Sequence, residues 1–399
     1  MKKIVVCSLF LAVMACAERK QSFEAEKILH FDVEEFANID MNNTGKFKQY
    51  EEQAAKSLKA PVTSYIPLQT TEECLIGEIN KLVCTDKYIY VYDRRFNKLY
   101  QFDTGGRFLR QIGQAGEGPD RYVKMCAFDV NSENGNVSIY CEVKSSVIEY
   151  SCTGEILKVE KTGLSIDDFV YYKGHYLFYC GRSSNEPAFK DTYPVQYRLV
   201  SLHNGKIDRK YLEYRYRNSL SNTVYTANDI GFYRLNGDLM LAEQQTGMVY
   251  KIEQNTIVPV YAVDFGKYNI PFDVFSAEVD DSKLDALPGM NFCHLLDFHE
   301  TGDLIYIRYS VFNNPICQSV YLKKTGETVN LGLYWINDSD NIGMPIIMTA
   351  SNDALAGYYD ADLFRHIVKH KADKVPAHLT EMANGIRDDD NPVICIVRF

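Results

Sequence analysis

The chain has 399 residues, of which 46% are hydrophobic and 24% are charged, and its formal net charge is −10. This acidic balance argues against nucleic acid as a partner, because a phosphate backbone selects for basic surfaces. The 29 tyrosines and 21 phenylalanines, against one tryptophan, favour a strand-rich core. The length would allow two domains, but large all-β folds of this size are often single units.

The first residues are typical of an export signal. Lys2 and Lys3 precede an almost wholly apolar run, 4–12, which is too short to span a bilayer and is typical of a signal peptide. The next four residues, 13–16 (VMAC), resemble a bacterial lipobox. We therefore expect residues 1–15 to be a lipoprotein signal peptide and Cys16 to carry the lipid that anchors the chain without spanning the membrane. The alternative is an ordinary signal peptide with a chance cysteine.

The residues after Cys16 bear on location. Ala17 is not the aspartate that retains many Gram-negative lipoproteins in the inner membrane, which favours the outer membrane. Residues 17–20 (AERK) lack the acidic run that often follows the cysteine of surface-exported lipoproteins, which favours a periplasm-facing position over a surface-exposed one. Without residues 1–15 the chain has 41 basic and 53 acidic residues, a formal charge of −12, which argues against a polybasic membrane patch.

A repeat of four predicted strands, here a to d, begins at residue 80. In its first copy the segment 103–106 (DTGG) forms a tight turn between strands c and d, because glycine readily adopts positive φ. Weaker copies follow, as expected of a β-propeller. The strands predicted for copies one to five are 80–84, 88–92, 98–102 and 108–112; 126–130, 137–141, 147–150 and 155–160; 168–172, 175–179, 197–201 and 207–212; 229–234, 238–242, 248–252 and 257–264; and 294–299, 303–307, 317–322 and 327–331.

The sixth copy is the least regular. It comprises predicted strands at 344–349 and 354–359, a helix at 361–372 and a final strand at 393–399. We expect an N-terminal strand, near 64–68 or 74–79, to complete its sheet and so join the two ends of the ring.

The sequence thus predicts an all-β fold, a six-bladed β-propeller of four-stranded antiparallel blades with a short helical insertion before the C-terminal strand. The propeller is expected over 61–399, after a tether and lead-in segment at 16–60. The alternative is an irregular β-sandwich.

The first blade also carries a family resemblance. The segments 89–93 (IYVYD) and 116–119 (GEGP), with Tyr122 and the ending 389–394 (DDNPVI), resemble the six-bladed β-propeller lipoproteins of Bacteroides-type bacteria, which are distantly NHL-repeat-like. The resemblance covers about residues 60 to 399. It implies the fold and an envelope location, and it supplies no catalytic residues.

Loop lengths single out one face of the predicted ring. In a propeller the a–b and c–d loops lie on one face, and the b–c and d–a loops lie on the other. The predicted a–b and c–d loops are short, whereas the long insertions 181–196, 213–228 and 266–293 are all b–c or d–a connections. Because long loops on a rigid scaffold often carry function, we predict the ligand on that face. The alternative is that these loops only cap the ring or contact a partner.

Arginine and tyrosine are frequent on that face. Arginine binds carboxylates through paired hydrogen bonds and tyrosine rings stack on sugars, so an anionic or glycan ligand would suit them. The candidate ligand-binding residues are Arg94, Arg95, Arg121, Tyr122, Arg182, Tyr193, Arg215 and Arg217. The alternative for each is ordinary packing or a solvated charge.

No cofactor is predicted, because the glycine-rich segment 113–118 lacks the ending of a phosphate loop and no nucleophile elbow occurs. NHL-like propellers, however, include lactonases and lyases that hold a metal in the central channel. The alternative metal set here is Asp168, Asp229 and His294, near the starts of three a strands. His366 and His370 share a helix face but lack the glutamate of a zinc-protease motif.

The function favoured by the sequence is a membrane-anchored lipoprotein that binds a small molecule or glycan, or docks on an outer-membrane transport partner. The alternative is a lactonase- or lyase-like propeller enzyme with a divalent metal in its channel. Nine cysteines follow Cys16, so their odd number leaves the pairing open.

Overall fold

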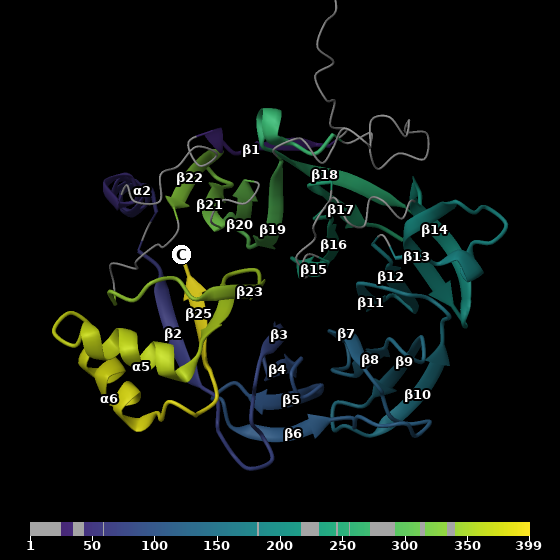
Figure 1. Ribbon diagram of the computed structural model, residues 1–399, viewed down its shortest axis with the longest axis horizontal. Helices are drawn as coiled ribbons and strands as arrows, with labels where there is room; N and C mark the ends of the chain where they lie inside the picture. The colour runs from purple at the N-terminus through teal and green to yellow at the C-terminus, as the bar shows by residue number, and fades with distance from the viewer. Residues whose placement is uncertain are drawn as a thin grey trace, which may run out of the picture.

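The computed structural model forms a ring of six sheets around a central channel (Figure 1). The predicted six-bladed β-propeller is therefore confirmed. The residues that the structure describes are 25–34, 44–58, 60–181, 183–216, 231–244, 246–254, 256–271, 292–311, 316–332 and 340–399.

Blades one to five are each built from four consecutive antiparallel strands, with the first strand innermost. Their strands are β3 (Ile79–Cys84), β4 (Tyr88–Asp93), β5 (Lys98–Asp103) and β6 (Phe108–Ile112); β7 (Met125–Val130), β8 (Val137–Cys141), β9 (Ser146–Tyr150) and β10 (Ile156–Lys161); β11 (Asp168–Tyr172), β12 (His175–Tyr179), β13 (Val195–His203) and β14 (Lys206–Arg215); β15 (Phe232–Leu235), β16 (Asp238–Ala242), β17 (Met248–Ile252) and β18 (Ile257–Asp264); and β19 (Cys293–Glu300), β20 (Leu304–Val311), β21 (Ile316–Leu322) and β22 (Glu327–Gly332).

Blade six joins the two ends of the chain. Its strands are β23 (Ile346–Ala350), β24 (Leu355–Tyr359), β25 (Val393–Arg398) and β2 (Val62–Pro67), in the order β2-β25-β24-β23. The outermost strand of this blade is therefore β2, from the N-terminal part of the chain. It overlaps the first of the two segments predicted to close the ring, 64–68, and not the second, 74–79. Gly106 in the tight turn of blade one lies against this strand, because a Cβ on it would come 2.3 Å from the Pro67 carbonyl oxygen, and its φ is +84°.

The N-terminal segment that precedes β2 lies along the outer rim of the ring. Strand β1 (Lys27–His30) pairs in parallel with β18 and makes blade four five-stranded. Helix α2 (Thr44–Ser57) lies outside blade five, beside β22 (Figure 1). The predicted tether at 16–60 thus contains a strand and a helix that pack on the propeller, which a reading of local strand patterns did not anticipate.

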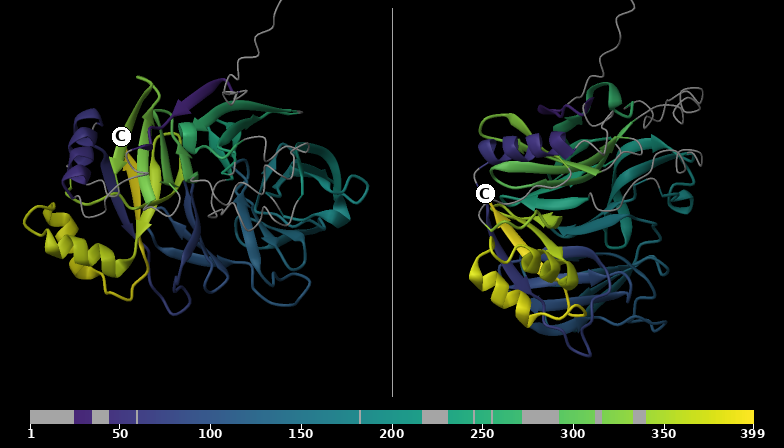
Figure 2. Two further views of the ribbon diagram at one scale, coloured as in Figure 1. Left: turned by 45° about the horizontal axis from the view of Figure 1, so that its top comes forward. Right: turned by 60° about the vertical axis from the view of Figure 1, so that its left-hand side comes forward.

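The helical insertion before the last strand contains two helices rather than the single predicted one. Helix α5 (Ala361–His370) matches the prediction, and α6 (Ala377–Gly385) follows it. Both lie in the b–c connection of blade six, outside β2 (Figures 1 and 2). Blade five differs too, because its second strand, predicted over 303–307, continues to Val311 in β20.

Apolar clusters between neighbouring blades form the core. One between blades one and two contains Tyr90, Phe128, Ile139 and Tyr150, all at most 1% exposed. The nine cysteines among the described residues are all free thiols, and six of them are buried. They act as small apolar side chains, and burial raises the pKa of the Cys126 thiol to about 12. Among the described residues, no helix is long and apolar enough to cross a membrane.

Candidate ligand site in the central channel

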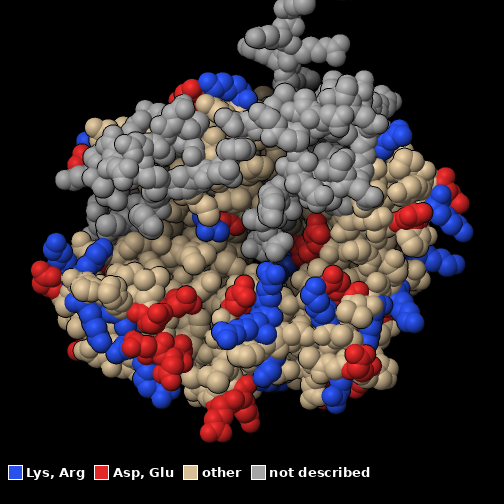
Figure 3. Space-filling model, viewed as in Figure 1, with Lys and Arg blue, Asp and Glu red and all other residues tan. Residues whose placement is uncertain are grey.

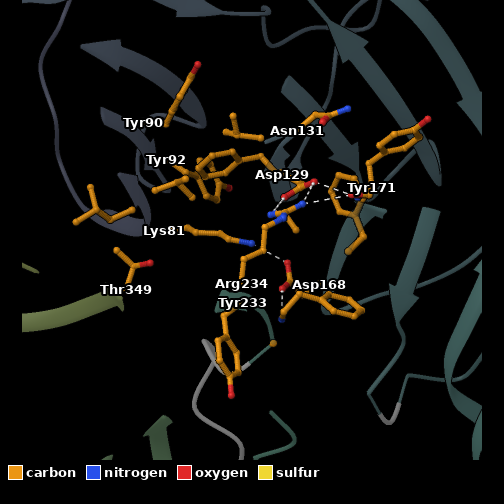
Figure 4. A pocket seen from close by; sticks show the side chains of 18 of the residues that line it. Lys81, Tyr90, Tyr92, Asp129, Asn131, Asp168, Tyr171, Tyr233, Arg234 and Thr349 are labelled. Carbon is orange, nitrogen blue, oxygen red and sulfur yellow. Dashed lines mark hydrogen bonds and ion pairs between the residues drawn. The ribbon is translucent and has the colours of Figure 1, made fainter. Parts of the chain in front are cut away.

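The channel holds a cavity of about 1450 Å³ that is lined by residues of all six blades. Most of its wall comes from the innermost strands and the a–b turns, with contributions from the b–c side. Charged, aromatic and hydroxyl-bearing side chains line it, among them Lys81, Asp168, Tyr171 and Thr349 (Figure 4). Concave sites with a few convergent polar groups are where proteins usually bind small molecules.

Four charged side chains converge in this cavity, and we call Lys81, Asp129, Asp168 and Arg234 the channel charge cluster. Lys81 on β3 pairs with Asp168 on β11, with 2.8 Å between Nζ and Oδ1. The ammonium also lies 5.6 Å from the centroid of the Phe128 ring. Because β3 and β11 belong to blades one and three, the pair reaches past blade two.

The second pair joins blades four and two. Arg234 on β15 donates two hydrogen bonds to Asp129 on β7, at 3.1 Å from Nη1 to Oδ1 and 3.3 Å from Nη2 to Oδ2. Its Nη2 also donates to the carbonyl oxygen of Tyr171, at 3.3 Å. The carboxylates are more buried than the cations, since the side chains of Asp129 and Asp168 are 10% and 13% exposed and those of Arg234 and Lys81 are 32% and 30% exposed.

Each carboxylate of the cluster also holds the backbone of the next blade. Asp129 Oδ2 accepts the Tyr171 N–H at 3.0 Å, and Asp168 Oδ2 accepts the Phe232 N–H at 3.1 Å. The second contact requires glycine at position 231, because a Cβ there would come 2.3 Å from Asp168 Oδ2. The two aspartates therefore have a structural role between neighbouring blades as well as a place in the cavity wall.

Asn352 joins three a–b turns at one end of the channel. Its Oδ1 accepts the Asn236 N–H at 2.7 Å, and its backbone carbonyl accepts the Gly302 N–H at 2.7 Å. These residues lie in the a–b turns of blades six, four and five. These contacts join three of the six blades on this face of the ring.

A buried ion pair lies behind the cavity wall between blades three and four. Arg198 Nε donates to Glu243 Oε1 at 2.7 Å, and the two side chains are 4% and 0% exposed. Tyr179, which lines the cavity, donates to the same carboxylate at 3.3 Å, and Thr246 donates at 2.9 Å. Burial and the adjacent carboxylate raise the Tyr179 pKa well above its ordinary value, so its hydroxyl stays protonated.

Two neighbouring residues of β19 complete the blade-five wall. Burial lowers the pKa of His299, which is 7% exposed, so its imidazole is neutral near pH 7. Glu300 accepts hydrogen bonds from Tyr233 (2.6 Å) and Tyr261 (2.9 Å) and pairs with Lys323 at 2.6 Å. This carboxylate is therefore fully engaged in holding blades four and five together.

The ligand-face residues nominated from the sequence are spread over the molecule. Arg94 lines the cavity, whereas Arg95 lies beside Gly77 and Phe96. Tyr122 is fully buried in the core between blades one and two.

The remaining nominated residues lie farther out. Arg121 follows the glycine-rich connection, and its carbonyl accepts the Lys144 ammonium. Tyr193 is 43% exposed in the b–c loop of blade three, and Arg215 ends β14. Arg182 and Arg217 lie outside the described residues.

The alternative metal set is not assembled in the described part of the chain. Asp168 is held by Lys81 and the Phe232 amide, and Asp229 lies outside the described residues. His294 is not among the residues that line the cavity, and burial lowers its pKa. The described residues contain no group of three or more His, Cys, Asp or Glu side chains able to hold a metal.

Reading loop composition did not identify Lys81, Arg234 or His299 as site residues. The sequence did contain a signal at one position of the innermost strand. In five of the six blades, the residue just before the last one that pairs with the second strand has a hydrogen-bonding side chain. These residues are Asp129, Tyr171, Arg234, His299 and Thr349, with Val83 at the same place in blade one. Polar residues in otherwise apolar inner strands therefore indicated the channel.

Comparison with known families accounts for most of the chain. Residues 38–398 match the family described as "Domain of unknown function (DUF4934)". The chain belongs to this family. No curated protein matches it. For this DUF4934 protein, the predicted resemblance to Bacteroides-type six-bladed propellers is confirmed, and the distant kinship with NHL repeats stays a prediction.

One solved structure shows the same fold, and two others are given for comparison. A Bacteroides fragilis protein inferred to be exported aligns over 94% of this chain and 99% of its own, at 17% identity and a TM-score of 0.68. A member of the duf4221 family from Bacteroides vulgatus aligns over 85% of this chain and 97% of its own, at 11% identity and a TM-score of 0.48. Virginiamycin B lyase from Staphylococcus aureus aligns over 85% and 99%, at 11% identity and a TM-score of 0.40.

Proposed function

We propose that this protein is an envelope binding module, anchored by a lipid on Cys16, that captures a small polar molecule in the channel of its propeller. The observation that carries the proposal is the 1450 Å³ cavity with the channel charge cluster in its wall. Ion pairs that are partly exposed to a cavity keep free lone pairs and N–H groups for a ligand.

The ligand enters, in this proposal, from the face with the b–c and d–a connections. The long connections of this face support this direction, because long loops on a rigid scaffold often bind ligands. Figure 3 looks onto the propeller along the view of Figure 1, and basic and acidic side chains lie next to one another near its middle. The lipobox-like segment and the residues after it support outer-membrane attachment facing the periplasm.

A thermal-shift screen of the chain starting at Ala17 tests the binding role. Probes from several classes are needed: saccharides, organic acids, amino acids and divalent metals. A molecule that binds only the folded state raises Tm, by RT ln(1 + [L]/Kd) in free energy. If none of them shifts Tm and an outer-membrane protein is recovered with the lipidated chain instead, the channel is not a capture site and docking replaces it.

The anchor is tested separately. Cells expressing the whole chain are given a labelled fatty acid, and the protein is followed into membrane and soluble fractions. We expect label on the wild type and none on Cys16→Ser, which is released from the membrane. Equal labelling of both would overturn the anchor and leave the binding role untouched.

A further inference from the structure

We propose that the channel charge cluster selects a neutral, hydroxyl-rich ligand, an oligosaccharide, over organic acids and amines. The inference rests on the proposed binding role and names the ligand class. It starts from charge balance: Lys81 is paired with Asp168 and Arg234 with Asp129, so the four side chains carry no net charge together.

An anionic ligand would have to compete with the aspartates. To form an ion pair with Arg234 or Lys81, it must displace Asp129 or Asp168 from that cation. The side chains of these aspartates are only 10% and 13% exposed, and the displaced carboxylate would be left without its cation. A buried charge without its partner is strongly unfavourable. The same reasoning applies to an amine, which would have to displace Lys81 or Arg234 from the aspartates.

A hydroxyl group avoids this conflict, because it both donates and accepts a hydrogen bond. Asp129 Oδ1 accepts one hydrogen bond from Arg234 and retains a lone pair, and Nη1 of Arg234 carries a second N–H, whereas both N–H groups of Nη2 are engaged by Asp129 and the Tyr171 carbonyl. Neighbouring hydroxyls of a sugar can therefore bind donor and acceptor of one intact ion pair at once.

The rest of the wall fits the same class. Uncharged hydrogen-bonding residues, among them Thr349, Ser351 and Asn131, lie around the cavity, and so do the partly exposed rings of Tyr171 and Phe232. Aromatic rings offer an apolar surface to the C–H faces of sugars. The cavity exceeds the about 300–1,000 Å³ usual for drug-sized ligands, which favours an oligosaccharide over a single sugar.

The test compares tetrasaccharides that differ in charge, by titration calorimetry on the chain starting at Ala17. The probes are neutral gluco-, manno- and galacto-tetraose, anionic tetragalacturonate and the cationic glucosamine tetramer. We expect at least one neutral probe to bind, and the charged probes to bind at least tenfold more weakly. Tighter binding of tetragalacturonate or of the glucosamine tetramer than of every neutral probe would overturn the inference.

Two variants connect the selectivity to the cluster. Asp129→Asn leaves Arg234 without its compensating charge, so we expect weaker binding of the neutral probe and at least tenfold stronger binding of tetragalacturonate than in the wild type. Thr349→Val removes one hydroxyl group from the cavity wall and should weaken the binding of the neutral probe about threefold. The matched control is Asp389→Asn, which neutralises an aspartate of an exposed pair outside the cavity and should change neither affinity.

The outcomes separate this inference from the proposed function. If an organic acid or amino acid binds and no neutral saccharide does, the binding role stands and the ligand class is wrong. If no small molecule binds at all, both fail. Unchanged charge selectivity in a folded Asp129→Asn protein would show that the cluster does not select the ligand.

Discussion

Arg234 reaches from blade four to Asp129 in blade two, and the two side chains meet in the channel through a pair of hydrogen bonds of 3.1 and 3.3 Å. Asp129 in turn accepts the Tyr171 N–H of blade three. One carboxylate thus connects three consecutive blades. Together with the pair between Lys81 and Asp168, it cross-connects blades one to four.

We expect Asp129→Ala to destabilise the fold by about 1–3 kcal/mol, because Arg234 and the Tyr171 N–H both lose their acceptor in a partly buried place. Urea unfolding measures the loss. The control is Glu142→Gln, in the exposed pair with Lys124, for which less than about 1 kcal/mol is expected. Equal losses in both variants would mean that the channel pair does not connect the blades.

Replacing one partner of the buried pair between Arg198 and Glu243 should lower the free energy of unfolding more than replacing both partners by apolar residues. Glu243→Gln leaves the guanidinium without its counter-charge at 4% exposure, and we expect a loss of about 3–5 kcal/mol in the free energy of unfolding. The double variant Arg198→Met with Glu243→Leu should lose less than Arg198→Met alone or Glu243→Leu alone. Chemical denaturation of the wild type, these two single variants and the double variant gives the comparison, and additive losses would contradict it.

Stability should fall as the pH drops below neutrality, in part through His299. Burial lowers its pKa in the folded protein, so the unfolded chain takes up a proton first, near the ordinary value of about 6.5. The stabilisation is therefore present above pH 6.5 and is lost as the pH falls toward the folded pKa. The slope from this one group is at most about 1.4 kcal/mol per pH unit.

Urea unfolding at pH 7.5, 6.5 and 5.5 checks this prediction. We expect His299→Gln to have a flatter dependence of stability on pH than the wild type. The control His378→Gln changes an exposed histidine of α6 and should keep the wild-type slope. An unaltered slope in the His299 variant would assign the pH dependence to other groups, such as His294.

The rim segment around β1 should contribute to global stability. Leu29, Phe31 and Val33 are at most 2% exposed and pack between blades four and five. Phe31→Ala should therefore lower the free energy of unfolding by about 3 kcal/mol or more. A chain that starts at residue 35 should lose more, and hydrogen exchange should speed up at the amides of β18, whose edge β1 covers.

A matched truncation provides the control for that experiment. A chain that starts at residue 25 retains β1 and every described element, so both its Tm and its exchange rates should equal those of the chain from Ala17. If the chain from residue 35 behaved identically as well, β1 would not stabilise blade four.

The fold could be predicted because its signals are local. Alternation of apolar residues over five or six positions, with turn glycines such as Gly106 and Gly154, is visible within each blade and repeats along the chain. The rim position of β1 could not be read in this way, since four residues with the sequence KILH carry little pattern and their partner strand lies more than 200 residues later.

What the sequence by itself determined is therefore the blade: its strands, its tight turns and the side of the ring on which the long connections lie. The site was decided by the tertiary structure, because Lys81 meets a partner 87 residues away and Arg234 one 105 residues away. Closing the ring brings the inner strands of all six blades around one cavity. Only that closure turns isolated polar residues of four of these strands into a balanced charge cluster.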